Sequence, residues 1–143
     1  MERFADAFFC DDVRHEVGGK VSYMGVYTGI LSVPHMPVTL PKLCLVGHIV
    51  TPLEQPFREL SFVLFKGDEI LQQGELGADV LANATSAAEG FGDEREPATR
   101  SAIRVSVLVS PFPISEPTTL KLIFKADGQE FDAATLRLRL MEA

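Results

Sequence analysis

The stretch from Thr119 to Leu140, TLKLIFKADGQEFDAATLRLRL, shows how this chain folds. Leu120, Leu122 and Phe124 alternate with mostly polar residues in its first half, and leucine alternates with arginine at its end. A period of two places the apolar side chains on one face of a β-strand. Asp127-Gly128 lies between the two halves, and this pair accepts the positive φ angles of a tight hairpin turn. The stretch therefore predicts an antiparallel hairpin with one buried face.

The same alternation continues upstream of this hairpin. Ile103–Val109 places isoleucine and valine at every second position. Leu43–Val50 is apolar almost throughout, and His48 is its single polar interruption. A strand without a polar side is typical of a sheet that is covered on both faces. We therefore expect Leu43–Val50 to be a central strand.

Glycine and proline residues divide the chain at regular intervals. Gly18-Gly19 separates Phe4–Asp11 from Val21–Tyr27, and proline clusters break the chain before Leu43 and after Val109. About eight or nine short strands divided by turns are typical of an antiparallel all-β fold. The sequence thus predicts an all-β, antiparallel β-sandwich with an immunoglobulin-like or similar layout. A closed barrel is the alternative, because a period of two fits both architectures.

Length and composition fit one globular domain, which we expect to span residues 1–143. The chain has 143 residues, of which 46% are hydrophobic and 23% charged. Its net charge of -7 argues against nucleic acid or an anionic membrane as a partner, because both require a basic surface. No stretch reaches the roughly 18 apolar residues of a membrane span. The first residues carry acids where a secretory signal has basic ones, so we expect a cytoplasmic protein.

One segment, Gly77–Pro97, differs from the rest of the chain. It holds five alanines, three glycines and five acidic residues, and no apolar period of two. Few of its residues can contribute the burial that offsets the entropy of ordering a chain. We interpret it as a mobile acidic excursion between strands, with a marginal helix over Ala78–Ala88 as the alternative.

The chain has two cysteines, Cys10 and Cys44, and both lie in expected strands among apolar neighbours. We expect them to be free, buried thiols, as is usual in a reducing compartment. Cys44 and His48 share one face of a strand, but four residues of a strand span about 13 Å, too far for two ligands of one zinc ion. No motif for a cofactor or a phosphate group occurs, so we expect no cofactor.

The densest polar cluster outside the acidic segment is Cys10-Asp11-Asp12-Val13-Arg14-His15-Glu16. As a binding site it would use five side chains, which are Asp12, Arg14, His15, Glu16 and the nearby Lys20. The alternative is a charged connection at the end of a strand, in which the Asp side chains accept backbone N–H groups and Arg14 pairs with a carboxylate. Adjacent acids on a strand point to opposite faces, so Asp11 and Asp12 make a poor acid–base pair. We favour the structural interpretation.

Several short motifs of the first third resemble a known bacterial family. They are Cys10-Asp11-Asp12-Val13-Arg14, Glu16-Val17-Gly18-Gly19-Lys20, Gly25-Val26-Tyr27 and Leu40-Pro41-Lys42-Leu43-Cys44. The family consists of small, uncharacterised single-domain proteins known only as a domain of unknown function. The resemblance implies a compact bacterial cytoplasmic protein, and it implies no activity, cofactor or catalytic residue.

Three classes of function follow from these observations. The first is a non-catalytic interaction or structural module that binds a protein partner or associates with itself, which the missing catalytic motifs favour. The second is a small-ligand or carbohydrate-binding domain, although the chain has no Trp and two Tyr. The third is a metal-assisted enzyme centred on Asp11–Glu16. We expect the first class.

Overall fold

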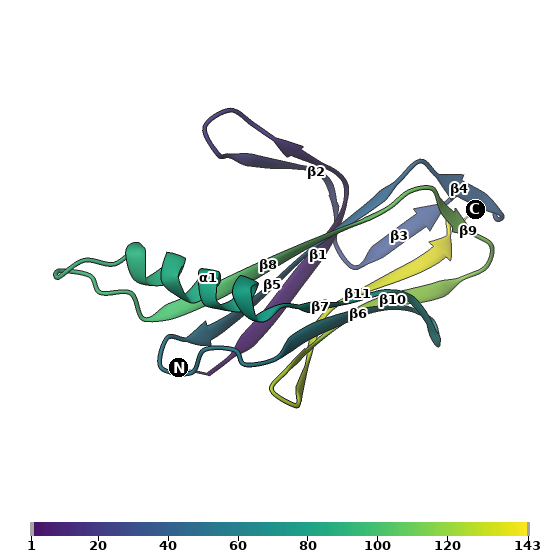
Figure 1. Ribbon diagram of the computed structural model, residues 1–143. Coiled ribbons are helices and arrows are strands. Elements are labelled where there is room, and N and C mark those ends of the chain that lie inside the picture. Colours follow the sequence, from purple (N-terminus) through teal and green to yellow (C-terminus); the bar gives the residue numbers. More distant parts are fainter. Residues whose placement is uncertain (1, 143) are drawn as a thin grey trace.

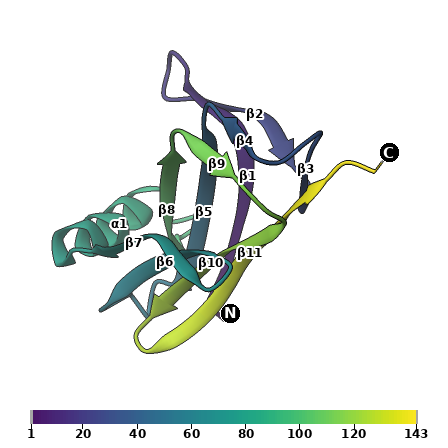
Figure 2. The same cartoon turned by 90° about the vertical axis from the view of Figure 1, so that its right-hand side faces the viewer.

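The computed structural model describes residues 2–142 and contains two stacked β-sheets, shown in Figures 1 and 2. Sheet A has the strand order β2 (Val21–Tyr27), β1 (Phe4–His15), β5 (Leu43–Pro52), β8 (Arg100–Val109). Sheet B has the order β3 (Ile30–Val33), β11 (Gln129–Leu140), β10 (Thr118–Ala126), β6 (Leu60–Lys66), β7 (Glu69–Leu76). A short ribbon pairs β4 (Val38–Leu40) with β9 (Phe112–Ile114). Within residues 2–142 the sheets stay open, so the fold is an all-β sandwich and the barrel alternative is wrong.

The hairpin predicted at Asp127-Gly128 is confirmed. Strands β10 and β11 pair antiparallel on either side of it, and both turn residues have positive φ, 50° at Asp127 and 86° at Gly128. The side chains of alternate residues on both strands are fully buried, namely Leu120, Leu122, Phe124 and Leu136. Residues Thr119–Leu140 thus form two inner strands of sheet B.

Strand β5 is one of the two inner strands of sheet A, as its apolar sequence predicts. Nine of its ten residues are buried, and His48 is the exception. Its odd-numbered residues face sheet B, where Gly47 lies against Leu122 and Phe124. A Cβ atom at Gly47 would lie 2.8 Å from Leu122 Cδ2 and 3.0 Å from Phe124 Cζ. A side chain at position 47 would therefore force Leu122 or Phe124 to move, because the two sheets pack closely there.

Two details of the predicted strand layout are wrong. The structure has 11 strands within residues 2–142, and two of the additional ones, β4 and β9, lie in segments that their prolines had marked as breaks. Phe112 and Ile114 of β9 are fully buried, so packing against the core outweighs the loss of the proline donors. Strand β1 also runs to His15 and not to Asp11, because β2 pairs with it along its whole second half.

The acidic segment is more ordered than its composition indicates. Residues Ala78–Gly90 form helix α1, so the interpretation as an irregular connection is wrong there and the helical alternative holds. Leu81 explains the difference, because its side chain is 6% exposed and belongs to the core cluster. One buried leucine anchors a helix that is otherwise rich in alanine, the residue with the highest helix propensity. The mobility of this segment stays a prediction.

Candidate functional site

The outer face of sheet A, the face turned away from sheet B, carries side chains from the even-numbered residues of β1, β5 and β8. Register places them in rows across the sheet. One row runs Val26, Cys10, Cys44, Leu108; the next runs Phe8, Val46, Ser106; another runs Phe4, Val50, Ala102. The face is therefore apolar over most of its area, although it lies outside the main core.

A single polar row interrupts this apolar face. Asp6, His48 and Arg104 are direct neighbours on β1, β5 and β8. His48 Nδ1 lies 3.5 Å from Asp6 Oδ1, and the two side chains are 35% and 69% exposed. His48 stands out in the sequence, but its partners do not, because they are 42 and 56 residues away from it in the chain and become neighbours only through strand register.

The β1–β2 arm, residues Asp11–Val26, turns away from the rest of sheet A, as Figure 1 shows. Gly25 has a φ of +64° in the middle of β2, a conformation that favours glycine and redirects the strand. Beyond this point the ring of Tyr23 packs against Phe8 of the outer face, with centroids 4.8 Å apart and planes at 72°. The arm is thus held to one end of the outer face by an edge-on aromatic pair.

The two acids of the sequence-predicted cluster have different partners. Lys42 Nζ donates a hydrogen bond to Asp12 Oδ1 over 2.5 Å and forms an ion pair with it. This bond is the main cause that lowers the pKa of Asp12 and raises that of Lys42. Tyr27 Oη donates to the carboxylate of Asp11, and burial together with this bond raises the pKa of the Tyr27 hydroxyl. The carboxylates of Asp11 and Asp12 are therefore engaged separately and do not form one site.

The other members of the cluster lie along the exposed arm. Arg14, His15, Glu16 and Lys20 are all exposed, the last two beside the Gly18-Gly19 turn. The expectation that Arg14 pairs with a carboxylate is wrong, because no ion pair of Arg14 within 4 Å occurs in residues 2–142. The expected capping is present once, where Asp12 Oδ1 accepts the N–H of Val13 over 3.0 Å. Lys42 was missed because it lies 30 residues from Asp12.

A hollow of about 240 Å³ lies where the arm joins the sheet. Asp12, His15, Lys42 and Leu108 contribute to its lining, so it contains two of the five sequence-predicted site residues. Leu108 is 58% exposed, and Val26 at the other end of its row is 48% exposed. Apolar side chains thus reach solvent on both sides of the buried pair Cys10 and Cys44.

A second hollow, of about 590 Å³, lies at the opposite end of the outer face, between the sheet and α1. Phe4, Val50 and Ala102 of the sheet and the alanines on one side of α1 contribute apolar surface. His48 and Arg100 are among its polar lining residues.

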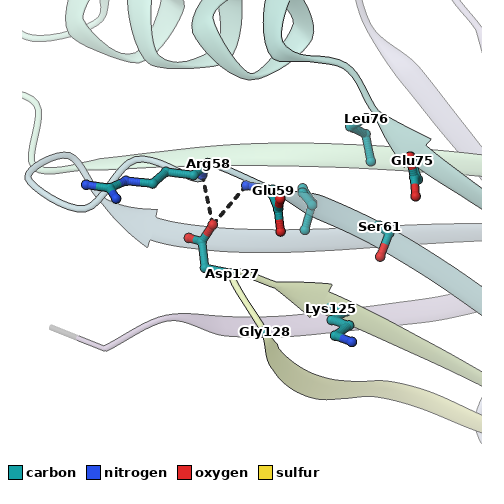
Figure 3. A pocket seen from close by; sticks show the side chains of 9 residues that line it. Arg58, Glu59, Ser61, Glu75, Leu76, Lys125, Asp127 and Gly128 are labelled. Carbon is teal, nitrogen blue, oxygen red and sulfur yellow. Dashed lines mark hydrogen bonds between the residues drawn. The ribbon is translucent and has the colours of Figure 1, made fainter.

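A third hollow, of about 410 Å³, lies at the tip of the β10–β11 hairpin and is shown in Figure 3. Asp127 lies at its edge, where its Oδ1 accepts the backbone N–H groups of Arg58 and Glu59 over 3.0 and 2.8 Å. Its Oδ2 forms an ion pair with Arg3 over 2.8 Å. Both oxygens are occupied by the protein itself, so Asp127 fastens the Arg58–Glu59 loop to the hairpin.

The two thiols are free and buried, as expected. Cys10 and Cys44 are directly opposite each other on β1 and β5, and their sulfurs donate to the carbonyls of Asp12 and Asp11. Burial, together with the nearby Cys44, raises the pKa of Cys10 to about 11. Nucleophilic chemistry needs the thiolate, which is scarce at neutral pH for such a group.

Two further observations concern a metal site and a membrane-spanning helix. Throughout residues 2–142, no three His, Cys, Asp or Glu side chains approach one another closely enough to hold a metal ion. No helix in this part of the chain has the length and apolar character needed to cross a bilayer.

Comparison with known proteins places the chain in a family but gives it no activity. No curated protein matches it. A family model described as "Family of unknown function (DUF6941)" matches residues 5–139, nearly the whole sandwich from β1 to β11. The chain therefore belongs to the family of unknown function DUF6941.

Proposed function

We propose that the chain is a non-catalytic protein-interaction module whose partner docks on the outer face of sheet A beside the β1–β2 arm. The observation that supports this most is the row Val26, Cys10, Cys44, Leu108, whose ends are about half exposed while its middle is buried. Apolar side chains grouped on one face, rimmed by polar residues, are typical of a protein-binding surface. Burying the rest of Leu108 would contribute about 1 kcal/mol to binding.

The arm supplies the polar rim of this surface. Arg14, His15 and Glu16 are exposed, and the ion pair of Asp12 with Lys42 lies at the arm's root. Charged groups around an apolar centre steer a partner and select it, more than they add affinity. The five residues singled out in the sequence therefore belong to the rim of the proposed surface and not to a catalytic centre.

The partner is a different protein and not a second copy. Each copy carries a net charge of -7, so two copies repel each other at low ionic strength. The polar rim of the arm has both signs of charge, so it offers no uniformly basic surface to offset this repulsion. A protein of lower negative charge with an apolar ridge fits the surface better.

Site-specific photo-crosslinking in the native host tests this proposal. A photoreactive phenylalanine replaces Leu108 on the proposed surface or, as the control, the exposed Lys121 on sheet B. We expect an adduct of defined mass from position 108 and none from position 121. The adduct should disappear when Val26→Asp is added, in a variant whose thermal midpoint shows that it is folded.

Three outcomes contradict the proposed position of the docking surface, and a fourth contradicts the identity of the partner. One is the absence of an adduct at position 108, another is an equal yield at position 121, and the third is an adduct that survives Val26→Asp. An adduct of twice the mass of the chain would make the partner a second copy. Size-exclusion chromatography with light scattering on the purified protein would then show a dimer, against our expectation of a monomer.

A further inference from the structure

The hollow between α1 and the outer face of sheet A combines an apolar interior with one exposed cation. Its volume of about 590 Å³ falls within the range of pockets that hold small molecules. Val50 and Ala102 form its floor, and Ala84, Ala87 and Ala88 of α1 form a wall. These small side chains create the space, because a larger residue at any of the alanine positions would fill it.

Arg100 is the cation of this hollow. It is the first residue of β8, it is exposed, and it has no ion pair within 4 Å in residues 2–142. Arg104 follows four residues later on the same face of the strand, with the small side chain of Ala102 between them. Arg100 is the arginine that lines the hollow, whereas Arg104 lies farther along β8, beside His48 of the next strand.

We propose that this hollow binds a small monocarboxylic acid with an apolar body. The carboxylate meets Arg100, whose planar fork matches the geometry of two carboxylate oxygens. The apolar body lies on Val50 and Ala102 under the alanines of α1. An uncharged molecule of the same shape would form no ion pair with Arg100 and would bind more weakly. A small ion without an apolar body would bury none of the apolar surface of Val50 and Ala102, so it would also bind more weakly.

The helix fixes the direction in which the ligand lies. Ala87 and Ala88 belong to the last turn of α1, where the carbonyl end of the helix carries a partial negative charge. A carboxylate is disfavoured there and favoured beside Arg100. Glu96 also lines the hollow and repels the same carboxylate, so it lowers the affinity. Because Glu96 repels a negative ligand, removing its charge should raise the affinity for a carboxylate and so tests the sign of the ligand's charge.

The site is separate from the surface proposed for a protein partner. The hollow lies at the α1 end of the outer face, whereas Leu108 and the arm lie at the other end. A variant in the hollow is thus expected to leave the crosslink at position 108 unchanged, and the failure of either proposal leaves the other standing.

Titration calorimetry with decanoate tests this inference, with decanol as the uncharged analogue. We expect decanoate to bind the full-length protein in a one-to-one ratio and decanol to bind at least tenfold more weakly. Arg100→Gln should weaken decanoate binding about ten- to a hundredfold, the effect of losing a charge-assisted hydrogen-bonded pair. Ala102→Leu should abolish binding by filling the floor, and Glu96→Gln should tighten it a few-fold. Arg139→Gln, on sheet B, is the matched control and should change nothing.

Equal binding of decanoate and decanol would overturn the inference, as would unchanged binding by Arg100→Gln. No binding of decanoate at millimolar concentration would also overturn it. Thermal midpoints of every variant show whether it is folded. Because Arg100, Ala102 and Glu96 are exposed, we expect midpoints close to that of the unmodified protein.

Discussion

Replacing Asp127 by alanine is expected to lower the free energy of unfolding by about 3.5 kcal/mol. Its carboxylate accepts two backbone N–H groups, and each of these bonds contributes about 1 kcal/mol. The partly exposed ion pair with Arg3 contributes about 0.5 kcal/mol. Alanine at a φ of 50° costs about 1 kcal/mol more, because its Cβ disfavours the left-handed region. With an unfolding entropy of about 0.3 kcal/mol per kelvin for a chain of 143 residues, the thermal midpoint falls by about 12 °C.

Two companion variants separate these contributions. Asp127→Gly relieves the backbone strain but removes the acceptor, so it should cost about 2 kcal/mol. Asp127→Asn tolerates the same φ and keeps one acceptor oxygen, so it should cost about 1 kcal/mol. Urea denaturation followed by circular dichroism measures all three. The assignment of Asp127 as a clamp is refuted if the alanine variant loses less than about 1 kcal/mol, or if asparagine costs as much as alanine.

The pH dependence of the same variants gives an independent check. Burial acts to raise the pKa of Asp127, but hydrogen bonds from Glu59, Arg3 and Arg58 hold it below its ordinary value of 3.8. A depressed folded-state pKa gives stability that is present above the unfolded-state pKa and is lost as the pH falls through the folded-state value. The difference in stability between the native protein and Asp127→Asn should therefore be full at pH 7 and shrink below about pH 4.

The remaining predictions concern the core, the thiols and the segment around α1. Leu138→Ala should lower the free energy of unfolding by about 2–5 kcal/mol, because the side chain is 2% exposed. Arg139→Ala, on the exposed side of β11, should lower it by less than about 0.5 kcal/mol. Equal losses in urea denaturation would mean that both sides of β11 are covered. Cys10 and Cys44 should react slowly with a thiol reagent below pH 8 and quickly in denaturant, and rapid labelling of the native protein would contradict their burial. Limited trypsin digestion should cut first within residues 77–100, at the exposed Arg95, and a first cut within β5 would mean that the sheet layout is wrong.

Local patterns in the sequence predicted the longer strands, but neither the short strands β4 and β9 nor the end of β1. The alternation in Leu136–Leu140 and the turn pair Asp127-Gly128 are complete within a few residues, so the hairpin could be read directly. The end of β1 could not be predicted in this way. The charged residues of Asp11–His15 are typical of the end of a strand, and the β2 backbone that pairs with them lies beyond a turn. Helix α1 was predicted only as the alternative, because its two buried residues, Leu81 and the small Ala88, leave no clear apolar period in the sequence.

Local sequence patterns revealed even less of the candidate sites, because these sites join residues that are distant in the chain. The polar cluster of Asp12, Arg14 and His15 was visible because its members are neighbours in the chain. The pair of Asp12 with Lys42 joins residues 30 positions apart, and the row of Asp6, His48 and Arg104 exists only through the register of three strands. Such sites follow from topology, which periodicity alone does not specify.

The missing side chain at Gly47 has a consequence for how this family can diverge. Because Leu122 and Phe124 occupy the space that a Cβ atom would need, position 47 is coupled to them and not free to drift on its own. A relative with alanine at 47 should carry a smaller residue at 122 or 124, since one added methyl group requires a comparable volume to be given up opposite it. Substitutions at these positions are thus expected to co-vary. In an alignment of relatives, the residue type at position 47 should correlate with the residue types at positions 122 and 124, because the two sheets pack closely at this point.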